Sequence, residues 1–133
     1  MHAVSLTTVP KISIVVRKSY GMAYSNMCGT GHAHHLVAWP TADMSFMAPE
    51  AGVNVVYARK LADSPDPEAE KQRLIEQWRI DCAPWRAAGL YMIDDVIDPR
   101  ETRHNIVHAI NLARTGRDRG MSKRLMADWP TSF

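Results

Sequence analysis

Two segments near the amino end of the chain have the pattern of a strand that ends where a helix begins. The first runs from Lys18 through Gly21 to Tyr24, and the second runs from Ala38 to Glu50 after a short spacer. The first amides of a helix lack partners within it, so at such a junction they converge on one point and attract negative charge. The two junctions therefore predict an α/β fold with a site that stabilises an anion.

A strand is expected just before the first junction. Lys11 to Arg17 is rich in β-branched residues and almost continuously apolar, which is typical of a strand covered on both faces in a layered α/β sheet. Pro10 marks its start. A short helix is expected over residues 23–28, and two short extended segments over residues 36–39 and 43–47.

Three helices are expected in the rest of the chain. The first starts at Pro49, because proline fits the first turn of a helix. The second covers residues 66–81, and its inward stripe consists of Leu74, Ile75, Trp78 and Cys82. The third starts with the capping box of residues 98–101 and stops near Gly116.

The chain has the composition of one globular domain. It has 133 residues, of which 46% are hydrophobic and 23% charged, so a core is feasible. We expect residues 1–115 to form one lobe and residues 116–133 to form a basic tail, either frayed or docked on a neighbouring subunit. The net charge of +2 argues against the concentrated basic face of a nucleic-acid-binding protein.

Neither a membrane span nor a disulfide is expected. The apolar run from Ile12 to Val16 is far too short to cross a bilayer, and no charged leader precedes it, so the cytoplasm is the expected compartment. Cys28 and Cys82 lie far apart in the sequence. We expect them to be small buried groups rather than a disulfide or a metal pair.

Three blocks of the sequence carry a family resemblance. Residues 9–24, 38–55 and 93–103 resemble, in order and spacing, the carboxyltransferase (β) subunits of biotin-dependent acyl-CoA carboxylases of the propionyl-CoA and acetyl-CoA types. The resemblance implies an α/β fold of crotonase-like ββα layers, of which this chain is a partial carboxy-terminal lobe. In the family, an amino-terminal lobe holds most of the coenzyme A contacts, and the site forms where lobes of two subunits meet.

The resemblance also implies an activity, the transfer of a carboxyl group from carboxybiotin to the α-carbon of an acyl-CoA. Biotin would be carried by a biotin carboxylase or biotin carrier subunit. This chain would then act in an oligomer with that partner and with an amino-terminal carboxyltransferase lobe or subunit. Two anions need stabilisation, the thioester enolate and the biotin ureido anion. Backbone amides suffice for both, which agrees with the lack of a convincing nucleophile-and-base arrangement in the sequence.

The family's Gly-Gly-Ala-Tyr-Asp turn falls on Gly21, Met22, Ala23, Tyr24 and Ser25. By resemblance, the amides of Met22 and Ala23 hold the ureido oxygen, and Gly21, Tyr24 and Ser25 contribute to the binding of biotin and substrate. Met22 replaces the family's second glycine, which would strain the backbone if that position required a positive φ. Ser25 replaces an acidic residue, and Ala48 replaces the glycine of the family's Met-Gly-Pro-Glu sequence.

Other residues have both a functional and a structural interpretation. Three histidines in residues 32–35 could share a metal ion, but no further ligand has a suitable spacing, so no metal is expected and a solvated loop is favoured. Three aspartates in residues 94–98 are interpreted as a strand end and a helix cap rather than an acid/base pair. Tyr24 is equally well a pocket wall or part of the core. The same choice between pocket and core holds for Met22, Met27, Met44 and Met47.

Two other functions remain open. One is a non-catalytic assembly or regulatory module that keeps the fold of the lobe but has lost the site. The other is a related acyl-CoA decarboxylase, which works the same half-reaction in reverse. The mass of the native assembly discriminates between an enzyme component and a module.

Overall fold

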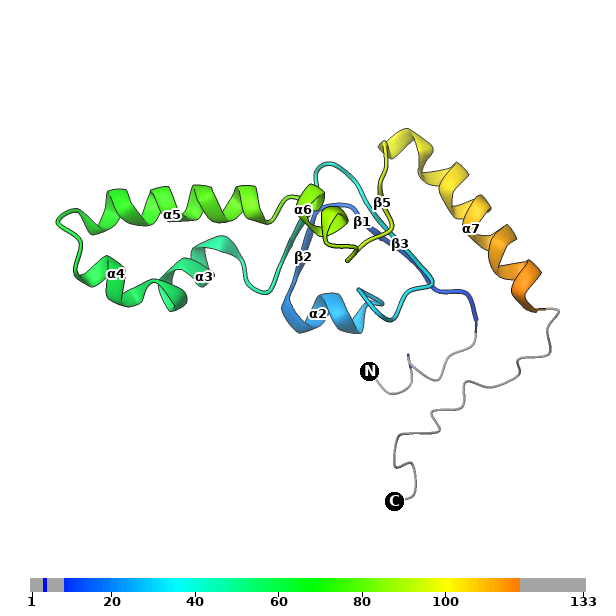
Figure 1. Cartoon of the computed structure of the whole chain (residues 1–133), viewed down its shortest axis with the longest axis horizontal. Helices are drawn as coiled ribbons and strands as arrows, with labels where there is room; N and C mark the ends of the chain where they lie inside the picture. Colours follow the sequence, from blue (N-terminus) through cyan, green and yellow to red (C-terminus); the bar gives the residue numbers. More distant parts are fainter. Residues whose placement is uncertain (1–3, 5–8, 118–133) are drawn as a thin grey trace, which may run out of the picture.

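The computed structural model describes residue 4 and residues 9–117. Short parallel strands form its centre, and helices extend from them on two sides (Figure 1). In chain order the elements are β1 Ile12–Val15, β2 Lys18–Tyr20, α2 Gly21–Asn26, β3 His35–Ala38, β4 Asp43–Ser45, α3 Pro49–Val56, α4 Ala58–Ala62, α5 Pro67–Asp81, α6 Pro84–Gly89, β5 Asp95–Val96, the 3₁₀ turn η1 Pro99–Glu101 and α7 Thr102–Arg117.

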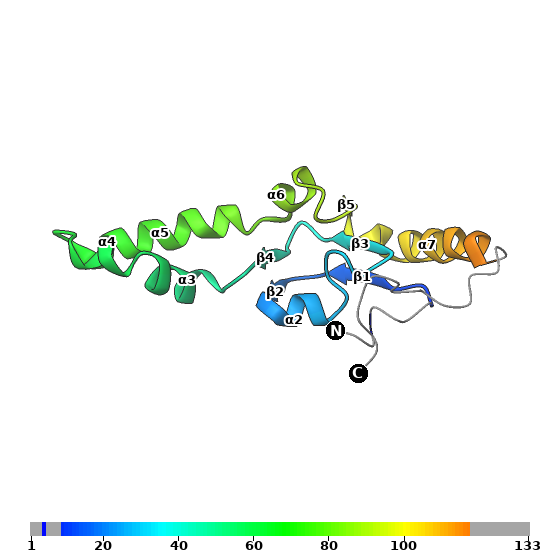
Figure 2. The same ribbon diagram turned by 60° about the horizontal axis from the view of Figure 1, so that its bottom comes forward.

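The strands of the described residues form two parallel sheets. In the first, β3 lies between β1 and β5, with Ile12 opposite His35 and Val37 opposite Asp95. In the second, β2 pairs with β4. The pair β1 and β3 therefore continues directly into the pair β2 and β4, as Figure 2 shows from a second side.

The most deeply buried strand is β3 rather than β1. Leu36, Val37 and Ala38 expose only 5%, 1% and 0% of their surface. β1 forms an edge of its sheet, and only Val15 of its four residues is buried, so the expected coverage of this strand on both faces is not found. The apolar run identified a strand but not its place in the sheet. The core cluster around β3 contains Val15, Leu36, Ala38, Ala42, Ala87 and Ile93.

The helices α3, α4 and α5 form an arm that projects away from the strands (Figure 1). The arm has a separate apolar cluster of Val53, Leu74 and Ile75. The indole of Trp78 lies against Gly52, where a Cβ atom would come within 2.5 Å of the ring. Glycine therefore permits the close approach of α3 and α5.

Two hydrogen bonds join this arm to β4. Trp78 Nε1 donates to Ser45 Oγ at 3.1 Å, and the Met44 amide donates to the Cys82 carbonyl at 2.8 Å. Cys82 is itself buried, as expected from the inward stripe of α5. The sheet and the arm thus meet at the end of α5, close to where β4 ends.

The helix boundaries expected from capping residues agree with the structure. Asp66 Oδ1 accepts from the Ala69 amide at 3.1 Å, and α5 ends at Asp81. Asp98 Oδ1 accepts from the Arg100 amide at 2.8 Å, so the capping box opens with η1 before α7 continues to residue 117. The expected basic tail lies outside the described residues from position 118 onward.

The helix α6 was not expected from the sequence. It has only six residues, too few to show an apolar period, and its one signal is Pro84 at the first helical position. Within residues 9–117, no helix is both long and apolar enough to cross a membrane.

Candidate functional site

The two strand-to-helix junctions expected from the sequence lie next to each other. β2 and β4 pair in parallel, with Tyr20 opposite Ser45, so both strands end at the same edge of their sheet. Gly21 makes the turn from β2 into α2 with a φ of +61°, which side chains rarely adopt. A Cβ atom at Gly21 would also lie 3.1 Å from the carbonyl oxygen of Phe46. Glycine at this position therefore allows the two junctions to approach each other.

The start of α2 presents backbone amides without a cap. The residue before the helix, Tyr20, makes no side-chain capping hydrogen bond, and the first turn carries no acidic side chain. The first amides of a helix lack partners within it, so the amides of Met22 and Ala23 create a region of positive potential. This helix covers residues 21–26 and so begins two residues before the expected position.

The residues that replace family glycines cause no backbone strain. The positive φ of this turn falls on Gly21, and Met22 is not among the described residues with a positive φ. Ala48 has a φ of −60° and directly precedes α3. The side chains at both positions are therefore compatible with the local backbone.

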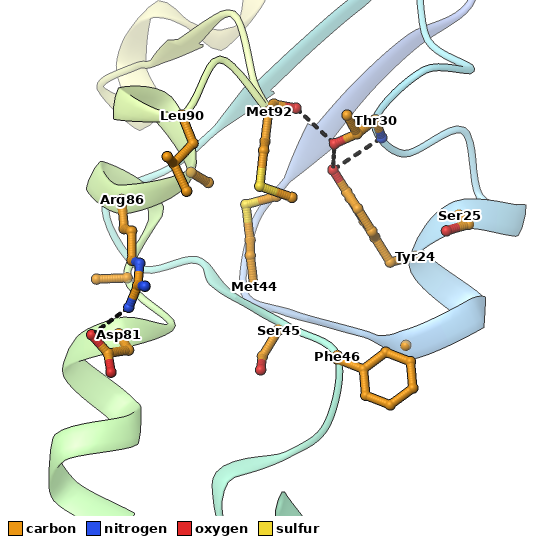
Figure 3. Close-up of a pocket in the computed structure, with 13 residues that line it drawn as sticks. Tyr24, Ser25, Thr30, Met44, Ser45, Phe46, Asp81, Arg86, Leu90 and Met92 are labelled. Carbon is orange, nitrogen blue, oxygen red and sulfur yellow. Dashed lines mark hydrogen bonds and ion pairs between the residues drawn. The ribbon is translucent and has the colours of Figure 1, made fainter.

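A cavity of about 440 Å³ lies beside the start of α2 (Figure 3). One wall comes from α2 and β4, and the other comes from the end of α5 and the segment around α6. Most of its lining is apolar. On the wall formed by the end of α5 and α6, the Arg86 guanidinium pairs with the Asp81 carboxylate at 2.7 Å. The lining residues are Gly21, Tyr24, Ser25, Thr30, Met44, Ser45, Phe46, Asp81, Ala83, Arg86, Ala87, Leu90 and Met92.

Tyr24 has both of the roles left open by the sequence. Its ring lines the cavity and also packs against the core cluster around β3. Its hydroxyl contacts the hydroxyl of Thr30 and accepts a hydrogen bond from the Thr30 amide at 3.0 Å. Tyr24 is therefore held in place on the wall of the cavity.

The remaining residues of the turn do not all face this cavity. Ser25 lines it, whereas the Met22 side chain is 60% exposed. Ala23 lines a second cavity of about 400 Å³, which lies between α2 and the strands β1 and β2. Of the other methionines, Met44 lines the first cavity and Met27 lines the second.

The histidines are not in a fully solvated loop, because two of them form hydrogen bonds with other segments. His34 Nδ1 accepts from the Lys11 amide at 3.1 Å. His35 begins β3, and its Nε2 lies 2.6 Å from Asn105 Oδ1 on α7, while its Nδ1 lies 3.6 Å from Asp94 Oδ2. In the described part of the chain, no three His, Cys, Asp or Glu side chains are placed to share a metal ion.

Of the aspartates near β5, Asp98 has the expected role of a helix cap, whereas Asp94 and Asp95 lie at the start of the strand rather than at its end. Asp94 Oδ2 accepts from the Leu36 amide at 2.7 Å and so joins the start of β5 to β3. A hydrogen bond from the Arg100 side chain lowers the pKa of Asp98 to about 2. A carboxylate that stays ionised to so low a pH is a weak base at neutral pH.

Both cysteines are free thiols, and Cys82 is the more buried of the two. Burial is the main reason why the pKa of the Cys82 thiol is raised. A raised pKa keeps the thiol protonated, which makes Cys82 an inert core residue rather than a nucleophile.

Sequence reasoning did not identify the wall of the cavity opposite α2. Arg86, Leu90 and Met92 reach the site from α6 and the residues that follow it. Thr30 reaches it from the loop after α2. No local pattern marks these residues, because their role depends on how α6 packs against β4.

The chain matches the family model of the carboxyl transferase domain over residues 1–126. It is 35% identical to the methylmalonyl-CoA decarboxylase subunit alpha of Propionigenium modestum, over 93% of this chain and 24% of that protein. It is 36% identical to the propionyl-CoA carboxylase carboxyltransferase subunit of Haloferax mediterranei, over 88% of this chain and 23% of that protein.

A solved structure of the transcarboxylase 12S hexamer, with methylmalonyl-coenzyme A bound, has the same fold. It matches this chain with a TM-score of 0.82 and 37% identity, over 86% of this chain and 22% of that one. The expected crotonase-like α/β class is thereby confirmed. This chain spans about a quarter of the length of these relatives. Since the family model covers most of the chain, the chain belongs to the carboxyl transferase domain family.

Proposed function

We propose that this chain supplies the biotin side of a carboxyltransferase site, at which a carboxyl group moves from carboxybiotin to the α-carbon of an acyl-CoA of the propionyl or acetyl type. The observation that carries the proposal is the uncapped start of α2 at Gly21, beside an apolar cavity. Because the chain belongs to the carboxyl transferase domain family, we assign carboxyl transfer as the reaction at this site.

The amides of Met22 and Ala23 are the proposed oxyanion donors. Carboxybiotin supplies the carboxyl group together with a ureido oxygen that becomes negative when that group leaves. A preorganised amide aimed at such an oxygen lowers the barrier by about 3 kcal/mol. The turn at Gly21, with a φ of +61°, leads directly into α2, and no acidic side chain in the first turn of α2 competes for these amides.

The cavity beside α2 suits a small fused-ring ligand. Its volume of about 440 Å³ is within the range of roughly 300 to 1,000 Å³ that is usual for small-molecule sites. Met44 and Met92 offer adaptable apolar surface, and Ser25 offers a hydroxyl in the lining. In this proposal Gly21, Tyr24 and Ser25 form the part of the wall nearest to the ureido oxygen.

Partner chains are part of the proposal. Several large apolar side chains near the cavity are exposed, among them Phe46 at 76% and Tyr91 at 94%. Such surface is typical of an interface. We propose that it is covered by an amino-terminal carboxyltransferase lobe or by further subunits, and that biotin arrives on a biotin carboxylase or carrier subunit. The cytoplasm remains the expected compartment of this assembly.

An acyl-CoA decarboxylase component is the second candidate. The similarity to a methylmalonyl-CoA decarboxylase subunit favours it. The same uncapped amides would then serve the reverse half-reaction, in which the carboxyl group leaves the acyl-CoA. The non-catalytic module is the third possibility, and it predicts an assembly without turnover.

The test begins with native purification and mass measurement of the full chain with whatever co-purifies. The assembly is then given methylmalonyl-CoA and free biotin without ATP, and propionyl-CoA is measured by mass spectrometry. Turnover that requires biotin, either added or carried by a co-purified subunit, supports carboxyl transfer. Release of carbon dioxide from an assembly that holds no biotin points to the decarboxylase, and a lone chain without turnover points to the module.

A matched pair of variants tests the site itself. Ala23→Trp places a large side chain at the third residue of α2 and is expected to abolish biotin-dependent turnover. Ala69→Trp makes the same change at the third residue of α5, at the far end of the arm, and is expected to leave turnover unchanged. An Ala23→Trp variant that keeps the turnover of the parent would refute the assignment of the oxyanion donors.

A further inference from the structure

A chain of hydrogen bonds with a defined direction joins α2 to the segment after α6 along the lining of the cavity (Figure 3). The Thr30 hydroxyl donates to the carbonyl oxygen of Met92 at 2.7 Å, because a carbonyl can only accept. Its single hydrogen is thereby used, so the contact between Thr30 Oγ1 and the Tyr24 hydroxyl has Tyr24 as the donor. The Tyr24 oxygen in turn accepts from the Thr30 amide at 3.0 Å.

In this arrangement the hydroxyl proton of Tyr24 is donated to Thr30 Oγ1. The phenol donates to Thr30 and accepts from the Thr30 amide, so its hydrogen is already used within the protein. Tyr24 therefore acts as a fixed wall of the cavity rather than as a proton donor to a ligand. Gly29 permits the close approach of the same ring, since a Cβ atom there would come within 2.8 Å of two of its carbon atoms.

The core cluster around β3 contacts α2 through the Tyr24 ring, which is only partly buried. None of the six residues of α2 is buried. At its carboxyl end, the Ser13 hydroxyl reaches the Met27 carbonyl at a long 3.4 Å. At the cavity, the connection through Thr30 joins α2 to Met92, a residue 62 positions later than Thr30 in the chain.

We propose that Thr30 is a positioning residue, which fixes the first turn of α2 against the opposite wall of the cavity through Tyr24. This inference rests on the proposed function, because the amides that it positions are those of Met22 and Ala23. The Thr30 hydroxyl itself is used by Tyr24 and Met92, so its effect on turnover is indirect. Small displacements of positioned groups lower catalytic rates strongly.

The test uses the native assembly with three single variants. Thr30→Val removes the hydroxyl at nearly constant volume, Thr30→Ser keeps it, and Tyr24→Phe removes the partner hydroxyl. Thr30→Val is expected to lower kcat about tenfold with little change in KM for the acyl-CoA. Thr30→Ser is expected to restore kcat. Because both hydroxyls belong to one connection, the double variant Tyr24→Phe with Thr30→Val is expected to have the same kcat as Thr30→Val alone.

A matched control is Thr41→Val. The Thr41 hydroxyl donates to the Val16 carbonyl at 2.7 Å, a bond of the same kind that lies outside the cavity lining. This variant is expected to keep the kcat of the parent. A Thr30→Val variant with the kcat of the parent would overturn the proposal, and so would a Thr30→Ser variant that fails to restore it.

Hydrogen exchange separates this proposal from the proposed function. Thr30→Val is expected to speed exchange of the Tyr24 to Met27 amides about fivefold, because one connection worth roughly 1 kcal/mol is lost. If the parent assembly shows no turnover at all, the proposed function fails and this measurement alone decides the role of Thr30. Faster exchange then supports the attachment of α2 through Thr30, and unchanged exchange overturns it.

Discussion

Replacement of Gly21 by alanine is expected to destabilise the chain by about 2 kcal/mol. The φ of +61° costs a residue with a Cβ atom about 1 kcal/mol relative to glycine. The added Cβ would lie 3.1 Å from the Phe46 carbonyl, so the connection between β4 and α3 has to move. Such overpacking costs about 1 kcal/mol more.

Two other glycines separate these contributions. Gly31 has a φ of +83°, and a Cβ atom there would meet nothing within 4 Å, so Gly31→Ala is expected to cost only the backbone share, about 1 kcal/mol. Gly89 ends α6 with open space around it and without a positive φ. Gly89→Ala is therefore expected to stabilise the chain slightly, by about 0.5 kcal/mol.

Urea unfolding followed by circular dichroism measures all three variants. From the highest to the lowest free energy of unfolding, the expected order is Gly89→Ala, parent, Gly31→Ala and Gly21→Ala. The slope of that free energy against urea concentration is expected to be the same for all four proteins. If Gly21→Ala and Gly31→Ala lose the same amount, the contact with Phe46 contributes nothing. If Gly21→Ala loses nothing, the turn between β2 and α2 is not the one described.

Two further predictions concern the arm. Gly52→Ala would place a Cβ within 2.5 Å of the Trp78 ring, so it is expected to lower the free energy of unfolding by about 2 kcal/mol. It is also expected to change the near-ultraviolet circular dichroism, which reports on the surroundings of the Trp78 ring. An unchanged urea midpoint would contradict this prediction. The hydrogen bond from Arg73, and then that from Lys60, lowers the pKa of Glu70 from 4.5 to about 2. A lowered pKa gives stability that is complete above about pH 4.5 and is lost as pH falls through about 2. The stability difference between the parent and Glu70→Gln is therefore expected to disappear over that range, and a carboxyl titration midpoint near 4.5 by NMR would refute it.

Local signals in the sequence predicted the local features of the fold. Asp66 with Pro67 located the start of α5, because a capping oxygen and a proline act within one helical turn. Pro49 located α3 in the same way. The glycine at position 21 marked the turn after β2, and its positive φ explains why that residue type is needed there. These features depend on residues that are close together in the sequence, so they can be predicted without knowledge of the tertiary structure.

Features that depend on distant residues were not predictable in this way. The apolar run of β1 gave no information on sheet order, so the central place of β3 was missed. The cavity wall formed by α6 depends on packing against β4, and the bond from Thr30 to Met92 spans 62 residues. The family resemblance supplied the candidate turn, whereas only the structure shows that Ser25 and Ala23 line different cavities.

The separate apolar cluster of the arm has a consequence for how the molecule tolerates change. Val53, Leu74 and Ile75 do not belong to the cluster around β3, and the arm is joined to β4 through Trp78 and Cys82. Substitutions that alter the length or charge of the outer part of the arm can therefore accumulate with little effect on the junction at Gly21. The outer arm can thus change its sequence while the strand ends and the turn at Gly21 keep their geometry.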